Sequence, residues 1–287
     1  MLSELRAGDE LAGVFACARK DRLHTRAGAP YLALELRDRS GALPARAFRN
    51  ADLLAGRFER GELVAVKGRV ERFRDQLVVE VEDIRRVDAE KDRVDPSAFL
   101  PSSYRDLDEL DGFLEYLAGE VHDPGYRRLL EALLGDRELR AQWRRAPCTR
   151  AGHHAYLGGL LEHTVAVATL AQELSQLHPR LDGDLLLCAA LVHDLGRARE
   201  FTYGAEIGLT DEGRLLGHLA IGQRLLEERA ARCGLDERRR LELLHCVLAH
   251  HGTSSGRFRS PEALALYRLN ALETGVKGVL ERGIGLE

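Results

Sequence analysis

The 287 residues are 45% hydrophobic and 31% charged, as expected for a soluble globular chain long enough to form two domains. The net charge of −4 excludes a global basic field for nucleic acid, and five cysteines without a CxxC pair exclude a disulfide framework. The chain shows neither a signal-peptide pattern nor an apolar run of spanning length, so we expect a cytoplasmic protein without a membrane partner.

Residues 1–88 predict a small barrel of five short strands. Residues 31–36 alternate between apolar and polar, and 43–48 form the returning strand. Residues 62–70 predict a further strand, in which Gly68 indicates a bulge or barrel bend, and 76–81 follow a hairpin tip. The pattern "YLALELRDRSGALPARAF … GELVAVKGRVERFRDQLVVEVEDI" resembles an OB-fold of the nucleic-acid-binding type.

One face of this barrel has the composition of a nucleic-acid platform. On a continuous strand, Lys67, Arg69 and Phe73 share the face opposite the valines of that strand. Cations beside an aromatic ring neutralise phosphates and stack bases, so we predict that these three residues bind single-stranded RNA or DNA. A solvated barrel face or a protein-interaction module is the alternative.

The rest of the chain is predicted to be helical. Residues 89–105 have the prolines, serines and mixed charge of a linker. Apolar spacing then predicts an all-α domain over 106–287, with helices at 107–118, 126–145, 158–177, 184–199, 215–233, 236–250 and 261–281. The predicted fold class is therefore a multidomain α and β chain, an N-terminal β-barrel followed by a helical bundle.

Histidines gather in the helical part, where nine of the eleven lie between positions 153 and 251. An apolar run, 185–192, ends in His193 and Asp194, and burying such a pair is costly unless a cation compensates. Helices bundled on their apolar faces bring this pair together with His163, His218, His250–His251, Asn270 and Glu273. Such mixed ligands suit Mn²⁺, Fe²⁺ or Zn²⁺. A single helical histidine is more often a core or surface residue, as we expect for His24, His122, His178 and His245.

Four strings carry a family resemblance: "HHAYLGGLLEHT" (153–164), "LLLCAALVHDLGRARE" (185–200), "EGRLLGHLAIG" (212–222) and "LLHCVLAHHG" (243–252). The "H … HD" skeleton resembles the HD-domain superfamily of metal-dependent phosphohydrolases. The four strings in this order resemble the YhaM-type 3′→5′ exoribonucleases, which also carry an OB-fold N-terminal to the HD domain.

The resemblance implies a two-metal site. It assigns His163, His193 and Asp194 to one ion, with Asp194 bridging, and His218 and His250 to the second. Asn270 stands where the family has its last aspartate, which removes a charge from the first site, and Glu273, on the same helical face, is a candidate to compensate. Arg197 replaces the family's lysine as a phosphate-binding cation. His153, His154 and His251 are assigned to substrate or to outer positions around the ions.

The implied reaction is 3′→5′ hydrolysis of single-stranded RNA, and of single-stranded DNA in addition, with Asp194 and Arg197 as catalytic residues. Two ions about 3.5–4 Å apart activate water in such sites. Mn²⁺ is the favoured ion, and Fe²⁺, Co²⁺, Mg²⁺ or Zn²⁺ are the alternatives. The resemblance also implies a homo-oligomer. Two other functions stay open, a phosphohydrolase of nucleotides or cyclic dinucleotides, and a nucleic-acid-binding protein with a degenerate HD site.

Overall fold

The computed structural model describes residues 1–88, 91–253 and 255–282. The chain forms two compact units, Met1–Pro101 with Thr202–Gly208, and Ser102–Phe201 with Leu209–Glu287. Positions 89–90 of the predicted linker, and 254 and 283–287 of the predicted helical domain, lie outside the described residues.

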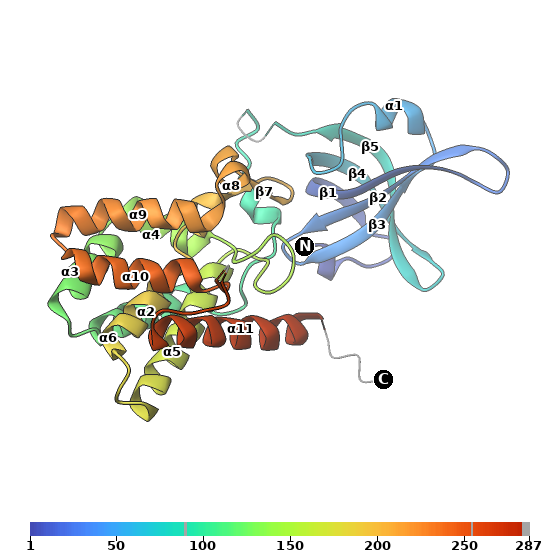
Figure 1. The fold of residues 1–287 in the computed structure, drawn as a ribbon. Coiled ribbons are helices and arrows are strands. Elements are labelled where there is room, and N and C mark those ends of the chain that lie inside the picture. Colours follow the sequence, from blue (N-terminus) through green and yellow to red (C-terminus); the bar gives the residue numbers. More distant parts are fainter. Residues whose placement is uncertain (89–90, 254, 283–287) are drawn as a thin grey trace. The chain divides into compact units, whose positions relative to one another are not determined.

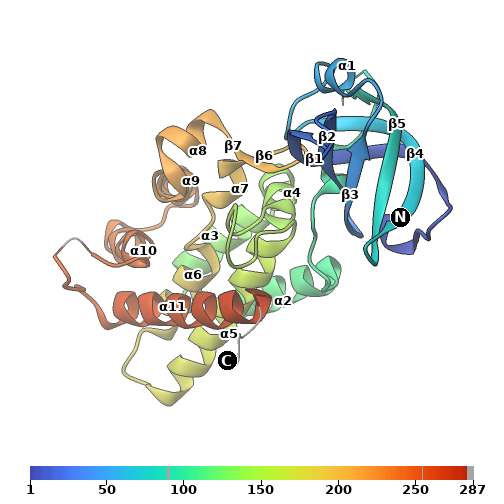
Figure 2. The ribbon, with the colours of Figure 1, turned by 90° about the vertical axis from the view of Figure 1, so that its right-hand side faces the viewer.

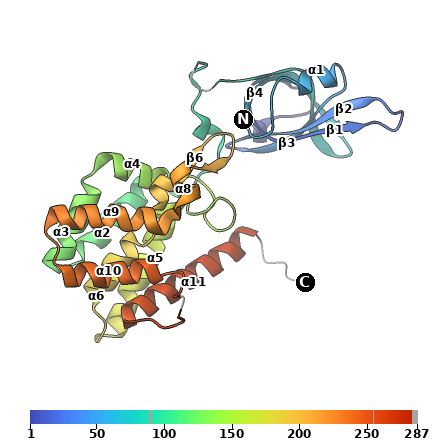
Figure 3. The same ribbon diagram turned by 45° about the horizontal axis from the view of Figure 1, so that its top comes forward.

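The first unit contains a closed five-stranded barrel with strand order β1-β2-β3-β5-β4 (Figure 1). Its strands are β1 Glu10–His24, β2 Pro30–Asp38, β3 Gly41–Ala47, β4 Leu63–Phe73 and β5 Gln76–Arg86, with the short helix α1, Ala51–Ala55, between β3 and β4. Neighbouring strands pair antiparallel except β3 and β5, which pair parallel. The predicted OB-type barrel is confirmed. We predicted no bounds for β1, and β2 extends beyond the predicted 31–36; the two strands project as a hairpin (Figure 3).

Alternation along each strand builds the barrel core. In β4 the buried Val64, Val66 and Val70 alternate with exposed positions such as Lys67 and Arg69. The predicted bulge lies where expected, because the β4–β5 register shifts between Lys67 and Gly68. A Cβ at Gly68 would lie 2.2 Å from the Glu80 carbonyl oxygen, so only glycine allows this approach of the two strands.

A small hairpin, β6 Phe201–Tyr203 and β7 Ile207–Leu209, belongs mostly to the first unit. The second unit is a helical bundle. Its helices are α2 Leu107–Gly119, α3 Pro124–Leu134, α4 Arg137–Arg145, α5 Gly159–Leu177, α6 Gly183–Val192, α7 Arg197–Glu200, α8 Asp211–Leu215, α9 Gly217–Cys233, α10 Glu237–Ala249 and α11 Pro261–Arg282. Every residue of α6 from Leu185 to Val192 is buried, and α11 packs against α5, α6 and α10 (Figure 2). No helix among the described residues is long and apolar enough to cross a membrane.

Two predicted helices are each divided in two, and a polar cap explains one of these divisions. The helix expected at 126–145 is broken after Gly135, because the Asp136 side chain accepts from the Leu139 amide and starts α4. The helix expected at 184–199 ends at Val192, and a turn carries His193 and Asp194 into α7. The helix expected at 215–233 corresponds to α9, and the short helix α8 that precedes it was not predicted.

Candidate metal centre

The predicted ligands converge from the ends and faces of separate helices. His163 lies in the second turn of α5, and His193 is the C-cap of α6. His218 lies in the first turn of α9, His250 is the C-cap of α10, and Asn270 lies in α11. All are buried except His218, which is partly exposed. The bundle therefore gathers a polar cluster inside an apolar core, as the sequence predicted.

Helix ends set the tautomers of two of these histidines. The last carbonyls of a helix lack amide partners, and two of them accept from a histidine three residues on. His193 Nδ1 donates to the Ala190 carbonyl (2.8 Å), and His250 Nδ1 donates to the Val247 carbonyl (2.6 Å). A carbonyl oxygen only accepts, so in the neutral rings the lone pair lies on Nε2.

The free lone pairs face other acceptors. His193 Nε2 lies 3.1 Å from His163 Nε2, and Asp194 Oδ1 lies 3.4 Å from both His218 Nε2 and His250 Nε2. Asp194 Oδ1, His250 Nε2 and Asn270 Oδ1 are buried without a hydrogen-bond partner in the part of the chain that the structure describes. Ligand atoms about 2.0–2.1 Å from one cation lie about 3–3.5 Å apart. The donor set therefore fits divalent ions.

The cluster has two lobes that share Asp194. His163, His193 and Asp194 form one lobe, and Asp194 with His218, His250 and His251 forms the other. Within each lobe the ligand atoms lie within 4.8 Å of one another. His251, expected outside the first ring of ligands, is placed with its Nε2 3.1 Å from that of His218. The first lobe contains the residues His163, His193 and Asp194 that the resemblance assigned to one ion, and the second adds His251 to those assigned to the other.

The charge states of these groups suit a cation. Desolvation holds the pKa of His193 well below its usual range. Desolvation, followed by the neighbouring His250, lowers the pKa of His251 to about 3. For Asp194 desolvation acts to raise the pKa, but the Arg197 charge and His193 outweigh it and hold the pKa well below its usual range. Neutral imidazoles and an ionised carboxylate are the forms that ligate metals.

Arg197 lies against the shared carboxylate. Its Nε is 2.8 Å from Asp194 Oδ2, and its Nη1 donates to Glu200 Oε2 at 3.3 Å. Asp194 thus presents one oxygen to Arg197 and the other to His218 and His250. This arrangement orients the carboxylate toward the histidine cluster.

The Glu273 carboxylate lies beside His163 and His154. His163 Nδ1 donates to Glu273 Oε2 (2.6 Å), and His154 Nε2 donates to Glu273 Oε1 (2.8 Å). Desolvation acts to raise the pKa of Glu273, but these two hydrogen bonds lower it to about 2. The carboxylate leaves His163 Nε2 free to face His193, which is the carboxylate–histidine arrangement that orients metal ligands. Asn270 Nδ2 donates to the His250 carbonyl at 3.4 Å.

The two histidines before α5 have different environments. His154 is buried, and its Nδ1 lies 2.9 Å from the Tyr156 hydroxyl. His153 Nε2 lies 3.6 Å from the sulfur of Cys148, a residue that the sequence reasoning assigned no role. The signal available in the sequence was its position, five residues before His153.

The predicted platform residues lie on the barrel surface. Lys67, Arg69 and Phe73 are exposed on β4, and Phe73 lies at its end, beside the β4–β5 turn. The Arg46 guanidinium lies 4.2 Å from the Phe73 ring centroid, and that of Arg74 lies 5.4 Å from it.

An aromatic pair also lies on the barrel: Tyr31 on β2 and Phe48 directly after β3 stack with their ring centroids 5.3 Å apart. From the sequence we predicted no binding role for Tyr31, Arg46 or Phe48. Their signal is alternation with the buried Leu32, Ala45 and Ala47.

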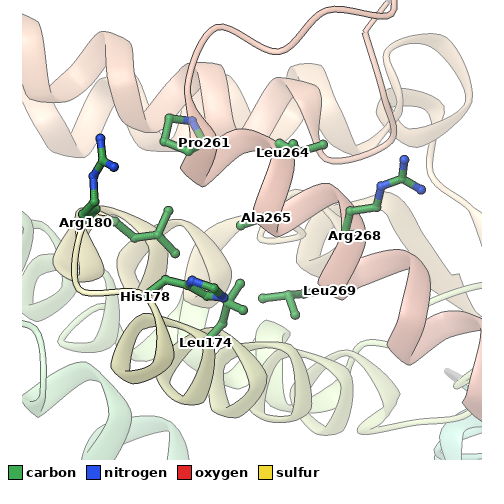
Figure 4. Close-up of a pocket in the computed structure, with 9 residues that line it drawn as sticks. Leu174, His178, Arg180, Pro261, Leu264, Ala265, Arg268 and Leu269 are labelled. Carbon is green, nitrogen blue, oxygen red and sulfur yellow. The ribbon is translucent and has the colours of Figure 1, made fainter.

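A groove between the end of α5 and the start of α11 encloses about 620 Å³ (Figure 4). Its lining is mostly apolar and includes Leu174, Leu264 and Leu269, with His178 and Arg268 as polar members. None of the clustered metal-ligand candidates lines it. The groove is therefore separate from the candidate metal centre.

Two family models match the chain. Residues 160–275 match the HD domain, and residues 17–87 match an OB-fold nucleic acid binding domain. The barrel, the helical bundle and the histidine cluster thus define an OB-fold protein with a metal-dependent HD hydrolase domain.

Curated relatives narrow this class. The chain is 30% identical to the 3′-5′ exoribonuclease YhaM of Bacillus subtilis over 225 residues, which cover 78% of this chain and 71% of the relative. It is 30% identical to YhaM of Shouchella clausii over 234 residues, 81% of this chain and 72% of the relative. The chain belongs to the YhaM 3′-5′ exoribonuclease family.

Among solved structures, a replication protein A heterotrimer bound to ssDNA is similar to this chain at 20% identity with a TM-score of 0.25. The match covers 32% of this chain and 67% of that one.

Proposed function

We propose that this protein is a metal-dependent 3′→5′ exonuclease that removes nucleotides from single-stranded RNA and single-stranded DNA. The observation that carries the proposal is the convergence of unpaired acceptors on Asp194. Asp194 Oδ1 and His250 Nε2 are both buried and lie 3.4 Å apart. The proton of the neutral His250 ring is on Nδ1, so the ring offers no hydrogen to this carboxylate oxygen. Membership of the YhaM family supports hydrolysis of phosphodiester bonds in RNA.

Two divalent ions, with Mn²⁺ as the first choice, are assigned to the two lobes. His163, His193, Asp194 and Asn270 would hold one, and Asp194, His218 and His250 the other. When bound, such ions lower the pKa of coordinated water and neutralise charge on the phosphate. Asp194 reaches both lobes, and the two backbone carbonyls that fix His193 and His250 keep the ligands oriented before an ion binds.

We assign substrate contacts to the residues around the ions according to which of their nitrogen atoms already have a partner in the protein. Arg197 forms an ion pair with Asp194 through Nε and donates to Glu200 through Nη1, and we assign its Nη2 to a phosphate oxygen. His251 is the exposed member of the second lobe, and we assign it to the substrate. Both ring nitrogens of His154 have hydrogen-bond partners, Tyr156 and Glu273. We therefore assign His154 to positioning Glu273 and not to direct contact with the substrate.

The barrel binds the single-stranded nucleic acid. Phe73, flanked by Arg46 and Arg74, offers a ring for base stacking beside cations for phosphate, and Lys67 and Arg69 extend the positive face along β4. Stacking on one aromatic residue contributes about 1–3 kcal/mol per base without much sequence preference. Such a surface suits an enzyme that degrades strands of any sequence.

The test is hydrolysis of 5′-labelled single-stranded RNA and DNA with Mn²⁺, Mg²⁺ or chelator. The wild type should produce a ladder of successively shorter products, and Asp194→Asn should produce none while binding the strand normally. Phe73→Ala is the matched control, because it should weaken strand binding and leave metal content unchanged. Full hydrolysis by Asp194→Asn, or hydrolysis of free nucleotides but not of strands, would overturn the proposal.

Asn270 favours a second candidate function, a nucleic-acid-binding protein whose HD site no longer hydrolyses. Its amide brings no charge to a position where the family carries a carboxylate. Metal analysis separates the two functions. Less than one transition-metal ion per chain, together with no hydrolysis in added Mn²⁺, would establish the binding protein.

A further inference from the structure

A buried thiol lies beside the first lobe. Cys148 is fully buried in the segment between α4 and α5, and it is free of any disulfide. Its sulfur lies 3.6 Å from His153 Nε2 and 3.6 Å from Asp194 Oδ2. Cys148, His153 and His163 each offer one ligand atom, and these three atoms lie within 4.8 Å of one another.

The spacing has the dimensions of a tetrahedral metal site. Zinc binds sulfur at about 2.3 Å and imidazole nitrogen at about 2.0–2.1 Å, which places a sulfur and a nitrogen ligand about 3.5–3.6 Å apart. The observed separation of Cys148 Sγ and His153 Nε2 is 3.6 Å. The separation of these two atoms is therefore that of two ligands of one ion.

The loop that carries these ligands is held by its own hydrogen bonds. The Cys148 amide donates to the His154 carbonyl (3.0 Å), and Thr149 Oγ1 donates to the His153 carbonyl (2.7 Å). His154 adopts a left-handed backbone conformation with φ of 49°, which turns the chain between His153 and α5. These contacts keep the sulfur and the His153 ring on the same side of the loop.

We propose that Cys148, His153 and His163 form a second kind of metal site, selective for soft divalent cations such as Zn²⁺ and Cd²⁺. Thiolate ligands favour these ions, whereas Mn²⁺ prefers oxygen and nitrogen ligands. On binding, the ion forms a bond to sulfur, and the thiol proton passes to solvent.

The new site and the first lobe share His163. An ion held by Cys148 withdraws His163 from His193 and Asp194, so the two sites exclude one another. Soft cations therefore inhibit an enzyme that Mn²⁺ activates. This consequence rests on the proposed exonuclease function, whereas the metal site itself does not.

The site is tested directly with Co²⁺, because a thiolate ligand gives cobalt an intense near-ultraviolet charge-transfer absorption. The wild type should show this absorption and Cys148→Ala should not. Cys188→Ala is the matched control, since Cys188 is equally buried but packs in the apolar core. Absorption that persists in Cys148→Ala, or that never appears in the folded wild type, overturns the site. Circular dichroism confirms folding, and Cys148→Ser replaces the alanine variant if that variant does not fold.

Inhibition is measured as RNA hydrolysis in fixed Mn²⁺ with rising Zn²⁺. The zinc concentration for half inhibition should rise about tenfold or more in Cys148→Ala and stay unchanged in Cys188→Ala. Equal zinc sensitivity of wild type and Cys148→Ala would overturn the inhibitory role. If no variant hydrolyses RNA, the proposed function fails while the cobalt spectra still decide the metal site.

Discussion

Gly196 controls how closely the His193–Asp194 turn approaches α9. A Cβ at this position would lie 2.0 Å from the His218 carbonyl oxygen and 2.6 Å from the Gly222 amide nitrogen. Its φ of −61° suits any residue, so the constraint is steric and not conformational. Because the obstructing atoms are backbone, Gly196→Ala must move α9 away by about 1 Å to restore normal contacts.

This displacement acts on stability and on the metal centre together. Overpacking typically costs about 1–3 kcal/mol, and a backbone obstruction places Gly196→Ala near the upper end, at about 2–3 kcal/mol. His218 is carried on α9, and its Nε2 lies 3.4 Å from Asp194 Oδ1. A shift of about 1 Å in a reacting group can cost about 100-fold in rate, so hydrolysis should fall by about that factor.

The assay combines urea unfolding, Mn²⁺ titration and RNA hydrolysis on wild type and Gly196→Ala. Gly112→Ala is the control, because a Cβ there meets nothing within 4 Å and alanine should stabilise α2 by about 0.8–1.0 kcal/mol. Wild-type stability, Mn²⁺ affinity and hydrolysis in Gly196→Ala would refute the close approach of α9 to the turn.

Three further changes test the surroundings. Glu273→Gln replaces a carboxylate oxygen that accepts from His163 or His154 with an amide NH₂ group, which donates. Mn²⁺ binding, measured by calorimetry, should weaken about tenfold. An unchanged Kd would contradict the role of Glu273 in orienting His163. Asn270→Asp adds a buried negative charge, so the melting temperature should fall in chelator and rise in Mn²⁺ relative to wild type, and equal shifts in both would argue against ligation. Asp136→Ala removes an N-cap and one of the two carboxylate partners of Arg229 and should cost about 1–2 kcal/mol at pH 7.

The pH dependence of the Asp136 effect follows from its lowered pKa, which a hydrogen bond from the Leu139 amide and then one from Arg229 produce. The contribution is present above the unfolded pKa of about 3.9 and is lost as pH falls through the folded value. Urea unfolding at pH 7 and near pH 3 should therefore show a smaller difference between wild type and variant at the lower pH.

Local patterns determined most of the fold. Alternation placed Val64, Val66 and Val70 in a barrel core, and helical periodicity placed the ligand histidines on buried faces, because burial of apolar surface imposes these periods on the sequence. The helix breaks at Gly135 and after Val192 were missed, since the apolar spacing continues across them.

The sequence by itself determined which residue types meet in the metal centre: imidazoles, one carboxylate at Asp194 and an amide at Asn270. Only the tertiary structure decided which atoms are free to bind, because tautomers and carboxylate orientation depend on partners from other helices. Glu273, on the face expected to compensate for Asn270, accepts a hydrogen bond from His163 Nδ1. Cys148 acquires ligand geometry only where the loop before α5 folds back over the His193–Asp194 turn. Such contacts leave no periodic trace in a single chain.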